Sequence, residues 1–338
     1  MAGKKTLVGQ LANSIVKRHP KAGSLTLARM LRKASPAVFT STEQARSAVR
    51  LVRGTIGTKN RRKYATCPRS KDDAEQCRTW GALLPDPAKT PWKIETLPTG
   101  PKKWLVLADI HIPYHDNAAI VAALKFGREQ KCDGVLLLGD VVDAYQLSYF
   151  CRDPRNRGPV DEITNVKQFL QTVKQALRPK AIVWRGANHE QRLERYLMQR
   201  APELFPAIAD CVSWRSLCGL DELGIQWIRW QNPIRVGKLT LLHGDEWSGG
   251  FYTPVNPART AFLKSLECVV IGHLHRTSEH TTRTLLETTI TCWSLGALCN
   301  LRPEYRPLND WNHGCGILDL TGKQWQFSSR RIIEGEVL

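Results

Sequence analysis

The first part of the chain carries three short apolar stripes with helical spacing. In the first stripe, apolar residues recur every four positions from Leu7 to Ile15, so their side chains share one face of a helix. The next two stripes end at Pro36 and at Gly54, residue types that stop helices. The pattern predicts three short helices and a small, basic all-α domain over residues 1–58 that resembles a helix-turn-helix bundle.

Polar residues stand at two of the expected helix starts. Ser24 precedes the second stripe and is expected to cap it. Thr40 and Glu43 have the spacing of a capping box at the start of the third. After the third helix, the basic run "KNRRKY" and prolines spread from 85 to 101 predict an extended, basic and Pro-rich linker over residues 59–101.

From residue 102 onward, short apolar runs alternate with helical stripes. The runs "KWLVLAD", "GVLLLGD" and "AIVWRG" predict buried strands, and the stripes at 117–130 and 166–177 predict the helices between them. Such alternation is typical of β-α-β units. Five later apolar runs, from "KLTLLHG" to "KQWQFSS", have few helices between them and predict a second, largely β half. The sequence therefore predicts an α/β domain over 102–338.

Positive charge is concentrated in the first third of the chain. Residues 1–100 contain 20 Lys and Arg against 6 Asp and Glu, whereas the other residues contain 29 against 25. This asymmetry favours nucleic acid as a partner of the N-terminal region. The alternatives are a solubilising basic tail and a small helical adaptor that binds protein.

Cysteines and apolar segments point to a reduced, non-membrane setting. The ten cysteines form no Cys-x-x-Cys pair, so we expect reduced core residues rather than a zinc ribbon. No run approaches the roughly 18 apolar residues of a membrane span, and the first residues lack a signal-peptide core. We expect a cytoplasmic protein without a membrane partner; the oligomeric state stays open.

Side chains that bind metals follow almost every predicted strand. Because strand ends are where α/β proteins place ligands, and residues two apart point the same way from an extended backbone, the series predicts a metal site. Glycines beside several of these residues allow the backbone to turn closely. The candidate residues, in chain order, are Asp109, His111, Asp140, Asp143, Asn188, His189, His243, His273 and His275.

These residues form a series of motifs that resembles the calcineurin-like metallophosphoesterase superfamily. The family pattern is D-x-H, G-D-x-x-[DN], G-N-H-[ED], a lone His and G-H-x-H, and this chain has "DIH", "GDVVD", "GANHE", His243 and "GHLH". The resemblance covers about 109–275. It implies a β-sandwich flanked by helices and hydrolysis of a phosphate ester.

The resemblance also implies two divalent metal ions. Two ions about 3.5–4 Å apart neutralise a phosphate ester and supply a bridging hydroxide for in-line attack. The first ion is assigned Asp109, His111, Asp140 and His275, and the second Asp140, Asn188, His243 and His273. This mixture of oxygen and imidazole ligands suits transition metals; we favour Mn²⁺, with Fe, Zn²⁺ and Mg²⁺ as alternatives.

Two further roles are carried over from the motifs. His189 is expected to act as the general acid that protonates the leaving oxygen, without binding a metal. Asp143 matches the aspartate that orients this histidine in the family's phosphoprotein phosphatases. One departure is Ala187, which stands where the family has Gly before Asn188. Because alanine is small and keeps the turn tight, we expect Asn188 to reach the second metal; if it does not, that metal binds weakly.

Variations in the motifs indicate the substrate class. The second motif is "GDVVDAY" instead of the "GDxVDRG" of phosphoprotein phosphatases, and the paired histidines are present, so the chain lies nearer to the phosphodiesterases and repair nucleases. "DIHIPYHD", "NHEQRLERYL" and the basic N-terminal segment resemble metallophosphoesterases of phages and prophages, which implies action in a bacterial host. Candidate substrate contacts are Tyr114, His115, Arg152, Arg155 and Arg157.

Three functions are compatible with these features. The first is a phosphodiesterase or nuclease acting on DNA or RNA, with the polymer held by the basic region. The second is a phosphomonoesterase for a phosphoprotein or metabolite, with an N-terminal protein adaptor. The third is a DNA-binding protein with an inert phosphoesterase half. The candidate nucleic-acid contacts are Arg29, Arg32, Lys33, Arg46, Arg50, Arg53, Arg61, Arg62 and Lys63.

Overall fold

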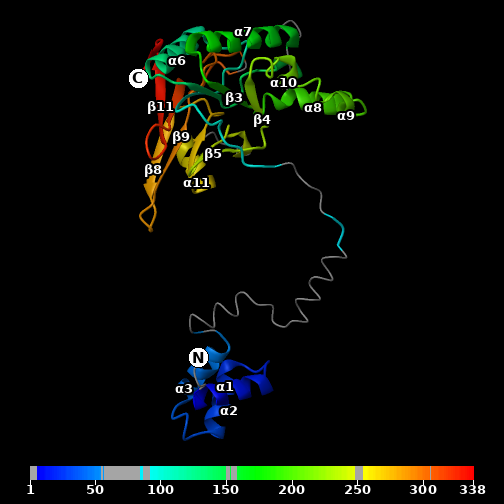
Figure 1. Cartoon of the computed structure of the whole chain (residues 1–338). Coiled ribbons are helices and arrows are strands. Elements are labelled where there is room, and N and C mark those ends of the chain that lie inside the picture. The colour runs from blue at the N-terminus through cyan, green and yellow to red at the C-terminus, as the bar shows by residue number, and fades with distance from the viewer. Residues whose placement is uncertain are drawn as a thin grey trace. The chain divides into compact units, whose positions relative to one another are not determined.

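The chain divides into two compact units, Met1–Thr90 and Pro91–Leu338. The computed structural model describes residues 6–54, 56, 84–86, 92–149, 153, 158–247, 254–304 and 306–338. The two units are drawn in blue and in cyan to red (Figure 1). No helix among the described residues is both long enough and apolar enough to cross a membrane.

The first unit is the predicted bundle of three helices. Its helices are α1 (Leu7–Arg18), α2 (Ser24–Ala34) and α3 (Thr42–Val52). They pack their apolar stripes into one buried cluster, which includes Leu27, Phe39 and Val49. The start residues differ from those predicted, because Gly23 is the N-cap of α2 and Ser41 caps α3 by accepting a hydrogen bond from the Gln44 amide.

The second unit contains two packed sheets. The seven-stranded sheet has the order β12-β11-β10-β1-β2-β3-β4, with β1 to β4 parallel. Its strands are β1 (Lys103–Leu107), β2 (Gly134–Leu137), β3 (Ala181–Arg185), β4 (Ile225–Ile228), β10 (His313–Asp319), β11 (Gln326–Ile333) and β12 (Glu336–Val337). The five-stranded sheet has the order β5-β6-β7-β9-β8. Its strands are β5 (Ile234–Val236), β6 (Leu239–Leu241), β7 (Cys268–Ile271), β8 (Ser278–Arg283) and β9 (Thr289–Ser294).

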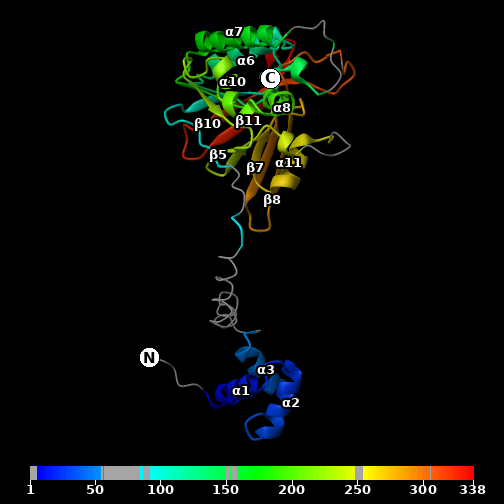
Figure 2. The same ribbon diagram turned by 90° about the vertical axis from the view of Figure 1, so that its right-hand side faces the viewer.

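Helices cover the outer faces of both sheets. The long helices α6 (Asn117–Glu129) and α7 (Pro159–Leu177) lie side by side over the seven-stranded sheet, and α11 (Pro257–Ser265) packs on the five-stranded one (Figures 1 and 2). Shorter helices follow β3: α8 (Gln191–Arg200), α9 (Phe205–Ile208) and α10 (Trp214–Leu217). The predicted β-sandwich flanked by helices is confirmed.

Strand β1 shows why the central runs are apolar throughout. Leu105 and Leu107 face the helices, whereas Trp104 and Val106 face the second sheet. Since both faces are buried, alternation with polar residues is absent, as in parallel sheets generally. Two cores result, one on each side of the seven-stranded sheet.

The second unit begins earlier in the chain than the predicted residue 102. Glu95 forms a bridge with Ile234, and its amide donates to the Pro233 carbonyl. The Asn232 side chain donates to the Glu95 carboxylate as well. These contacts attach the end of the expected linker to the edge of β5, so residues 92–101 belong to the second unit by packing.

Candidate metal centre

The polar residues that follow β1, β2, β3, β6 and β7 lie together at one edge of the sandwich, where the carboxyl ends of these parallel strands meet. The chain turns sharply there. Asp109, His111, Asp140, His273 and His275 have φ between 51° and 65°, a left-handed conformation that non-glycine residues rarely adopt. Such backbone strain is found mostly at functional sites, where surrounding structure holds it in place.

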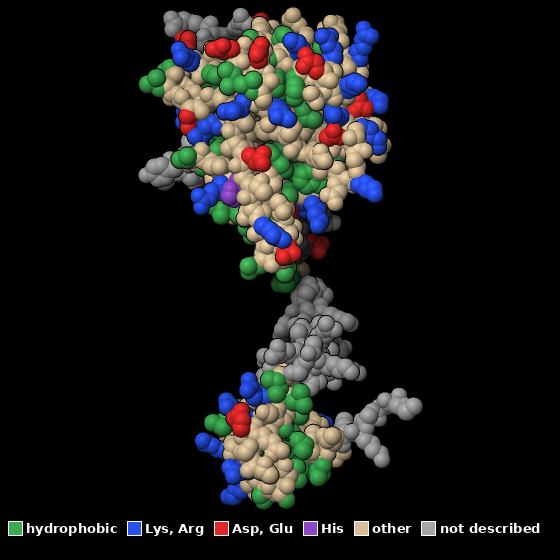
Figure 3. Space-filling model, turned by 90° about the vertical axis from the view of Figure 1, so that its left-hand side faces the viewer, with side chains coloured by type: hydrophobic (Ala, Val, Ile, Leu, Met, Phe, Trp, Pro, Cys, Tyr) green, Lys and Arg blue, Asp and Glu red, His purple; other side chains and the backbone are tan. Residues whose placement is uncertain are grey.

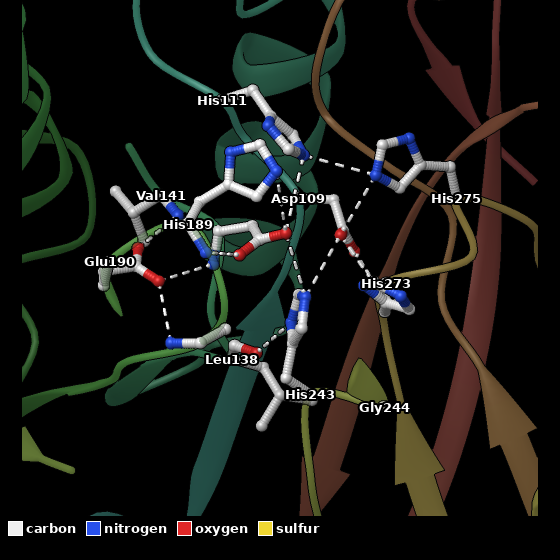
Figure 4. Close-up of polar contacts among 12 residues, drawn as sticks. Asp109, His111, Leu138, Val141, His189, Glu190, His243, Gly244, His273 and His275 are labelled. Carbon is white, nitrogen blue, oxygen red and sulfur yellow. Dashed lines mark hydrogen bonds and ion pairs between the residues drawn. The ribbon is translucent and has the colours of Figure 1, made fainter. Parts of the chain in front are cut away.

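A first group of ligand atoms surrounds the side chain of Asp109. His275 Nε2 lies 3.2 Å from Asp109 Oδ1 and 3.2 Å from His111 Nε2. These side chains converge on a single point (Figure 4). Both oxygens of Asp109 also accept hydrogen bonds from the His273 amide, at 3.1 and 3.0 Å. Gly272 permits this approach, because a Cβ there would lie 2.6 Å from Asp109 Oδ2.

A second group forms around the Asp140 carboxylate. His243 Nε2 lies 3.0 Å from Asp140 Oδ2, and the ligand atoms of Asp140, His243 and His273 are all within 4.8 Å of one another. His243 Nδ1 donates to the Leu138 carbonyl at 2.9 Å, which leaves Nε2 turned toward the carboxylates. His111 Nε2 is 3.8 Å from Asp140 Oδ2, so Asp140 lies between the two groups.

The side-chain oxygen of Asn188 shows whether the residues present fit a metal ion. Its Oδ1 is buried and has no hydrogen-bond partner. Such an orphaned oxygen is costly in a folded protein unless something binds it. An amide oxygen is a suitable ligand for a divalent cation, and the next residue, His189, donates its amide to Asp140 Oδ1 at 3.1 Å, which brings this segment to the second group. The residues present therefore fit the metal pair that the motifs imply.

Ala187 does not disturb the turn before Asn188. It is absent from the described residues with positive φ, so its backbone does not require glycine. The Ala187 side chain is buried against Gly139, where a Cβ would lie 2.5 Å from the Ala187 Cβ. The absence of a side chain at Gly139 therefore leaves room for the Ala187 methyl group. The fold thus accommodates alanine where the family has glycine.

His189 lies at the edge of the second group with both ring nitrogens occupied. Its Nδ1 donates to the Asp143 carbonyl oxygen at 2.8 Å, while the Asp143 carboxylate Oδ1 is 3.4 Å away. That same Oδ1 accepts a shorter hydrogen bond, 2.9 Å, from His111 Nδ1. Asp143 thus holds His189 mainly through its backbone and orients His111 through its carboxylate, a division that the motif did not reveal.

Arg192 is a site residue that the motifs missed. Its Nη1 donates to the Asp143 carbonyl at 2.8 Å, and its Nη2 donates to His189 Nε2 at 3.0 Å. The guanidinium therefore occupies the nitrogen from which a general acid would deliver its proton. In the sequence it stands three residues after His189, one helical turn along "NHEQRLERYL", but that resemblance assigned it no role.

Glu190 holds two of the strand ends together. Its buried carboxylate accepts hydrogen bonds from the amides of Asp140, Val141 and Ala187, at 3.1, 2.8 and 2.8 Å (Figure 4). Burial raises the pKa of Glu190, and Asp140 raises it further. The motif contained this residue, but only the fold shows that it anchors the loop after β2 to the loop after β3.

The protonation states of the centre follow from burial and from the mixture of charges. Burial raises the pKa of Asp140, but His189 and His243 outweigh burial and lower this pKa well below its usual value. Burial lowers the pKa of His243, yet Asp140 and Asp109 raise it well above 6.5. Burial and the charge of His243 lower the pKa of His273 to about 4. Asp140 thus stays ionised, and His243 has to release its proton when a metal binds.

Cys299 is a second neighbour that the sequence did not indicate. Its buried thiol lies 3.9 Å from His275 Nδ1, and burial raises its pKa well above 9.0. His111, His275 and Cys299 have ligand atoms within 4.8 Å of one another, as do His111, Asp140 and His189. The thiol is on the Nδ1 side of His275, away from the Nε2 that faces Asp109.

The candidate substrate contacts fall into two sets. Tyr114 packs edge-on against Tyr145, 5.9 Å between ring centres, and burial and Asp143 raise its pKa to about 12. His115 forms a bridge with Cys299, which ties it to the loop after β9. Arg152, Arg155 and Arg157 lie outside the described residues.

The residues predicted to contact nucleic acid differ in their exposure and in their partners within the bundle. Arg29, Arg32 and Lys33 are exposed on α2. Arg53 is used inside the bundle, where its guanidinium donates to the Ser24 hydroxyl and to the carbonyls of Pro20 and Ala22. Arg46 forms an exposed ion pair with Glu43, and Arg50 is partly buried on α3. Arg61, Arg62 and Lys63 are outside the described residues.

Comparison with known proteins gives both relatives and a family. The gene 54 protein of Mycobacterium phage L5 is 26% identical over 182 residues, which cover 52% of this chain and 69% of that protein. A dimetal phosphatase from Danio rerio has 12% identity and a TM-score of 0.37, covering 70% of this chain and 98% of that one. The phosphoesterase YfcE from E. coli has 18% identity and a TM-score of 0.31, covering 64% and 88%.

A family model described as calcineurin-like phosphoesterase matches residues 102–289, which is more than half of the chain. The match includes every strand end of the centre and all of its candidate ligands. The chain therefore belongs to the calcineurin-like phosphoesterase family and is a metal-dependent phosphoric ester hydrolase.

Proposed function

We propose that this protein is a phosphodiesterase that cleaves nucleic acid at a pair of divalent metal ions. Asp109, His111 and His275 would hold one ion, and Asn188, His243 and His273 the other, with Asp140 shared between them. The unpartnered oxygen of Asn188 and the fixed Nδ1 of His243 support this assignment. We favour Mn²⁺ for the assay, because this mixed donor set suits Mn²⁺, Fe or Zn²⁺ better than Ca²⁺.

The ions, when bound, neutralise the charge of the phosphate ester and activate water. The chain's own residues then supply orientation and a proton. His189 donates from Nε2 to the leaving oxygen, while the Asp143 carbonyl keeps Nδ1 in place. Burial lowers the pKa of His189, but the charges of Asp140 and Asp143 outweigh burial and raise it. Arg192 has to move from His189 toward the phosphate for this proton to be delivered.

The observation that carries the choice of nucleic acid is the charge of the helical bundle. Residues 6–54 contain nine Lys and Arg and a single acidic residue, Glu43. Basic side chains gather along one edge of the bundle in the face shown in Figure 3. A folded unit of this size with so little acidic charge suits a polyanion, which it would bind mainly through phosphates.

The similarity to a phage protein supports a phage or prophage origin. We accordingly place the reaction inside a bacterial host. In that setting the bundle would keep a polymeric substrate close to the catalytic unit, and tethering raises the local concentration of the substrate without any new contact at the active site.

The test is Mn²⁺-dependent cleavage of labelled single- and double-stranded DNA and RNA, with Asp140→Asn as the inactive control. The triple variant Arg29→Gln/Arg32→Gln/Lys33→Gln should bind nucleic acid with a weaker salt dependence than wild type. Because three positive charges are removed, the slope of log K against log salt concentration should change by about 2–3. The matched control is Lys125→Gln/Arg128→Gln/Lys131→Gln, three exposed cations of the catalytic unit. Turnover of a mono-aryl phosphate with nucleic acid left intact would replace this proposal with the phosphomonoesterase.

A further inference from the structure

A cavity of about 280 Å³ opens along α8, directly beside the metal centre. Its inner end is the part lined by Asn188 and Arg192, which belong to or contact the metal centre. Arg195, Tyr196 and Tyr149 also line it, together with Leu147, Ser148 and Gln199 among the described residues. Its volume is just below the roughly 300–1,000 Å³ of ordinary ligand sites, so it suits a single nucleoside rather than a larger group.

The inner end of the cavity meets the reacting groups. Asn188 is the candidate metal ligand with the unpartnered oxygen, and Arg192 donates to His189 Nε2 at 3.0 Å. Whatever fills the cavity therefore lies on the side of His189, the proton donor. In the proposed reaction this is the side on which the leaving group departs.

The charge of the cavity wall selects an anionic or neutral occupant. Two arginines line it, and no Asp or Glu does so among the described residues. Arg195 follows Arg192 by one helical turn, and its guanidinium is held by the Gln191 side-chain oxygen. A guanidinium fixed in this way is suited to a phosphate.

Two tyrosines make the outer part of the cavity aromatic. Tyr149 is 86% exposed and Tyr196 is 37% exposed. Exposed aromatic rings next to arginines form platforms for nucleobases, and stacking on such a ring is worth about 1–3 kcal/mol per base. Neither tyrosine was among the candidate residues of the sequence: Tyr149 follows β2, and Tyr196 lies on α8 within "NHEQRLERYL".

We propose that this cavity binds the nucleoside of the leaving group, with its base stacked on Tyr196 and Tyr149 and the next phosphate of the strand on Arg195. The inference rests on the proposed phosphodiesterase function and narrows its substrate to single-stranded nucleic acid. A base can enter the cavity only after it leaves its own stack and its pairing partner, and that separation costs a few kcal/mol in a duplex.

Matched dinucleotides test the inference. Thymidylyl-thymidine is compared with two analogues in which one or the other nucleoside lacks its base, so the leaving alcohol is unchanged. Wild type should cleave the analogue lacking the leaving-side base with a KM about tenfold higher, the lower end of the stacking energy. Tyr196→Ala should abolish this preference, and Tyr196→Phe should restore it, since the ring is retained. Met198→Ala, an exposed change on the same helix that does not line the cavity, should keep the preference.

The two proposals fail in different ways. If wild type hydrolyses methyl 4-nitrophenyl phosphate but treats thymidylyl-thymidine and both analogues alike, the nucleoside site is refuted while the phosphodiesterase stands. Faster cleavage of duplex than of single-stranded DNA of the same sequence also refutes it. If no diester is hydrolysed, the proposed function fails. Binding then decides the nucleoside site: Asp140→Asn should bind pentathymidylate about tenfold more tightly than Asp140→Asn/Tyr196→Ala, and equal affinities refute it.

Discussion

The helical bundle and the catalytic unit place their charges in opposite ways. In the bundle every residue of the buried cluster is apolar, and Arg29, Arg32 and Lys33 are exposed. The catalytic unit buries charged groups at its centre: Asp109 and Arg185 are 0% exposed, and Asp140 is 1% exposed. Among the described residues, fully buried charged side chains occur in the catalytic unit and not in the bundle.

The difference indicates what each unit does. Burying a charge costs several kcal/mol unless hydrogen bonds, an opposite charge or a metal compensates for it. The partners that compensate for burial also hold the buried charged side chains in one geometry, as catalysis requires. Exposed cations stay solvated, so folding does not desolvate their charge. Solvated cations of this kind suit the binding of a polyanion without sequence preference. Four experiments test this contrast.

The largest effect should come from the carboxylate between the two ligand groups. Asp140→Asn keeps the shape but removes the shared charge, so we expect kcat/KM to fall by about 10³-fold or more, several kcal/mol of transition-state stabilisation. Titration calorimetry should show weaker Mn²⁺ binding. Asp161→Asn, the same change on the exposed start of α7, serves as control and should retain full activity. An active Asp140→Asn would refute the proposed ligand set.

Removal of the proton donor should follow. His189→Gln is expected to lower kcat by about 10²–10⁴-fold on dinucleotides, whose leaving alcohol needs a proton. The loss should be much smaller on 4-nitrophenyl esters, because nitrophenolate leaves without one. Exposed His19 provides the matched His19→Gln control. Equal losses on both substrates would show that His189 has only a structural role.

The free energy of unfolding tests how much the catalytic unit depends on its buried charges. The Arg185 guanidinium is fully buried, donates to the carbonyls of Asn232 and Trp230, and pairs with Glu246. Arg185→Met leaves Glu246 without its partner and should cost about 3–5 kcal/mol of unfolding free energy. Glu246→Gln/Arg185→Met should recover part of that loss in denaturant titrations. If Arg185→Met unfolds at the same denaturant concentration as wild type, the buried ion pair does not stabilise the catalytic unit.

The smallest effect concerns a buried carboxylate away from the ligands. Glu162 is 1% exposed, and burial raises its pKa from 4.5 to about 7. The folded state prefers the protonated form, so the stabilisation is complete below pH 4.5 and is lost as the pH rises through about 7. Glu162→Gln should remove this pH dependence and stabilise the protein at pH 8 by at most about 3 kcal/mol. Denaturant titrations at pH 5 and pH 8 measure the free energy of unfolding of Glu162→Gln and wild type, with Glu129→Gln at an exposed position as control. An unchanged pH profile in Glu162→Gln would contradict the assignment.

Much of the centre was predictable because its motifs are local. "DIH" after one apolar run and "GHLH" after another each place two side chains at a strand end, and the parallel order of the strands brings those ends together. The helices of the bundle were predictable for the same reason, since an apolar stripe and a stop residue lie within one short segment. The cap of α3 is Ser41 instead of its polar neighbour Thr40, and α2 begins after Gly23 without a side-chain cap, so Ser24 is already helical.

Contacts between distant segments were not predictable in this way. The orientation of His111 by Asp143 depends on a hydrogen bond between residues 32 positions apart. Glu190 reaches the amide of Asp140 across 50 positions. The edge strand contact of Glu95 with Ile234 likewise joins a predicted linker to the sheet.

The sequence by itself determined the family, the uneven distribution of charge along the chain and the candidate metal-binding side chains, because these depend on residue type and short-range spacing. Only the tertiary structure decided which nitrogen of each histidine faces the centre, that Arg192 covers the proton donor, and that α8 forms a cavity with Tyr149. These features depend on packing between elements, and packing is set by the whole core rather than by any one segment.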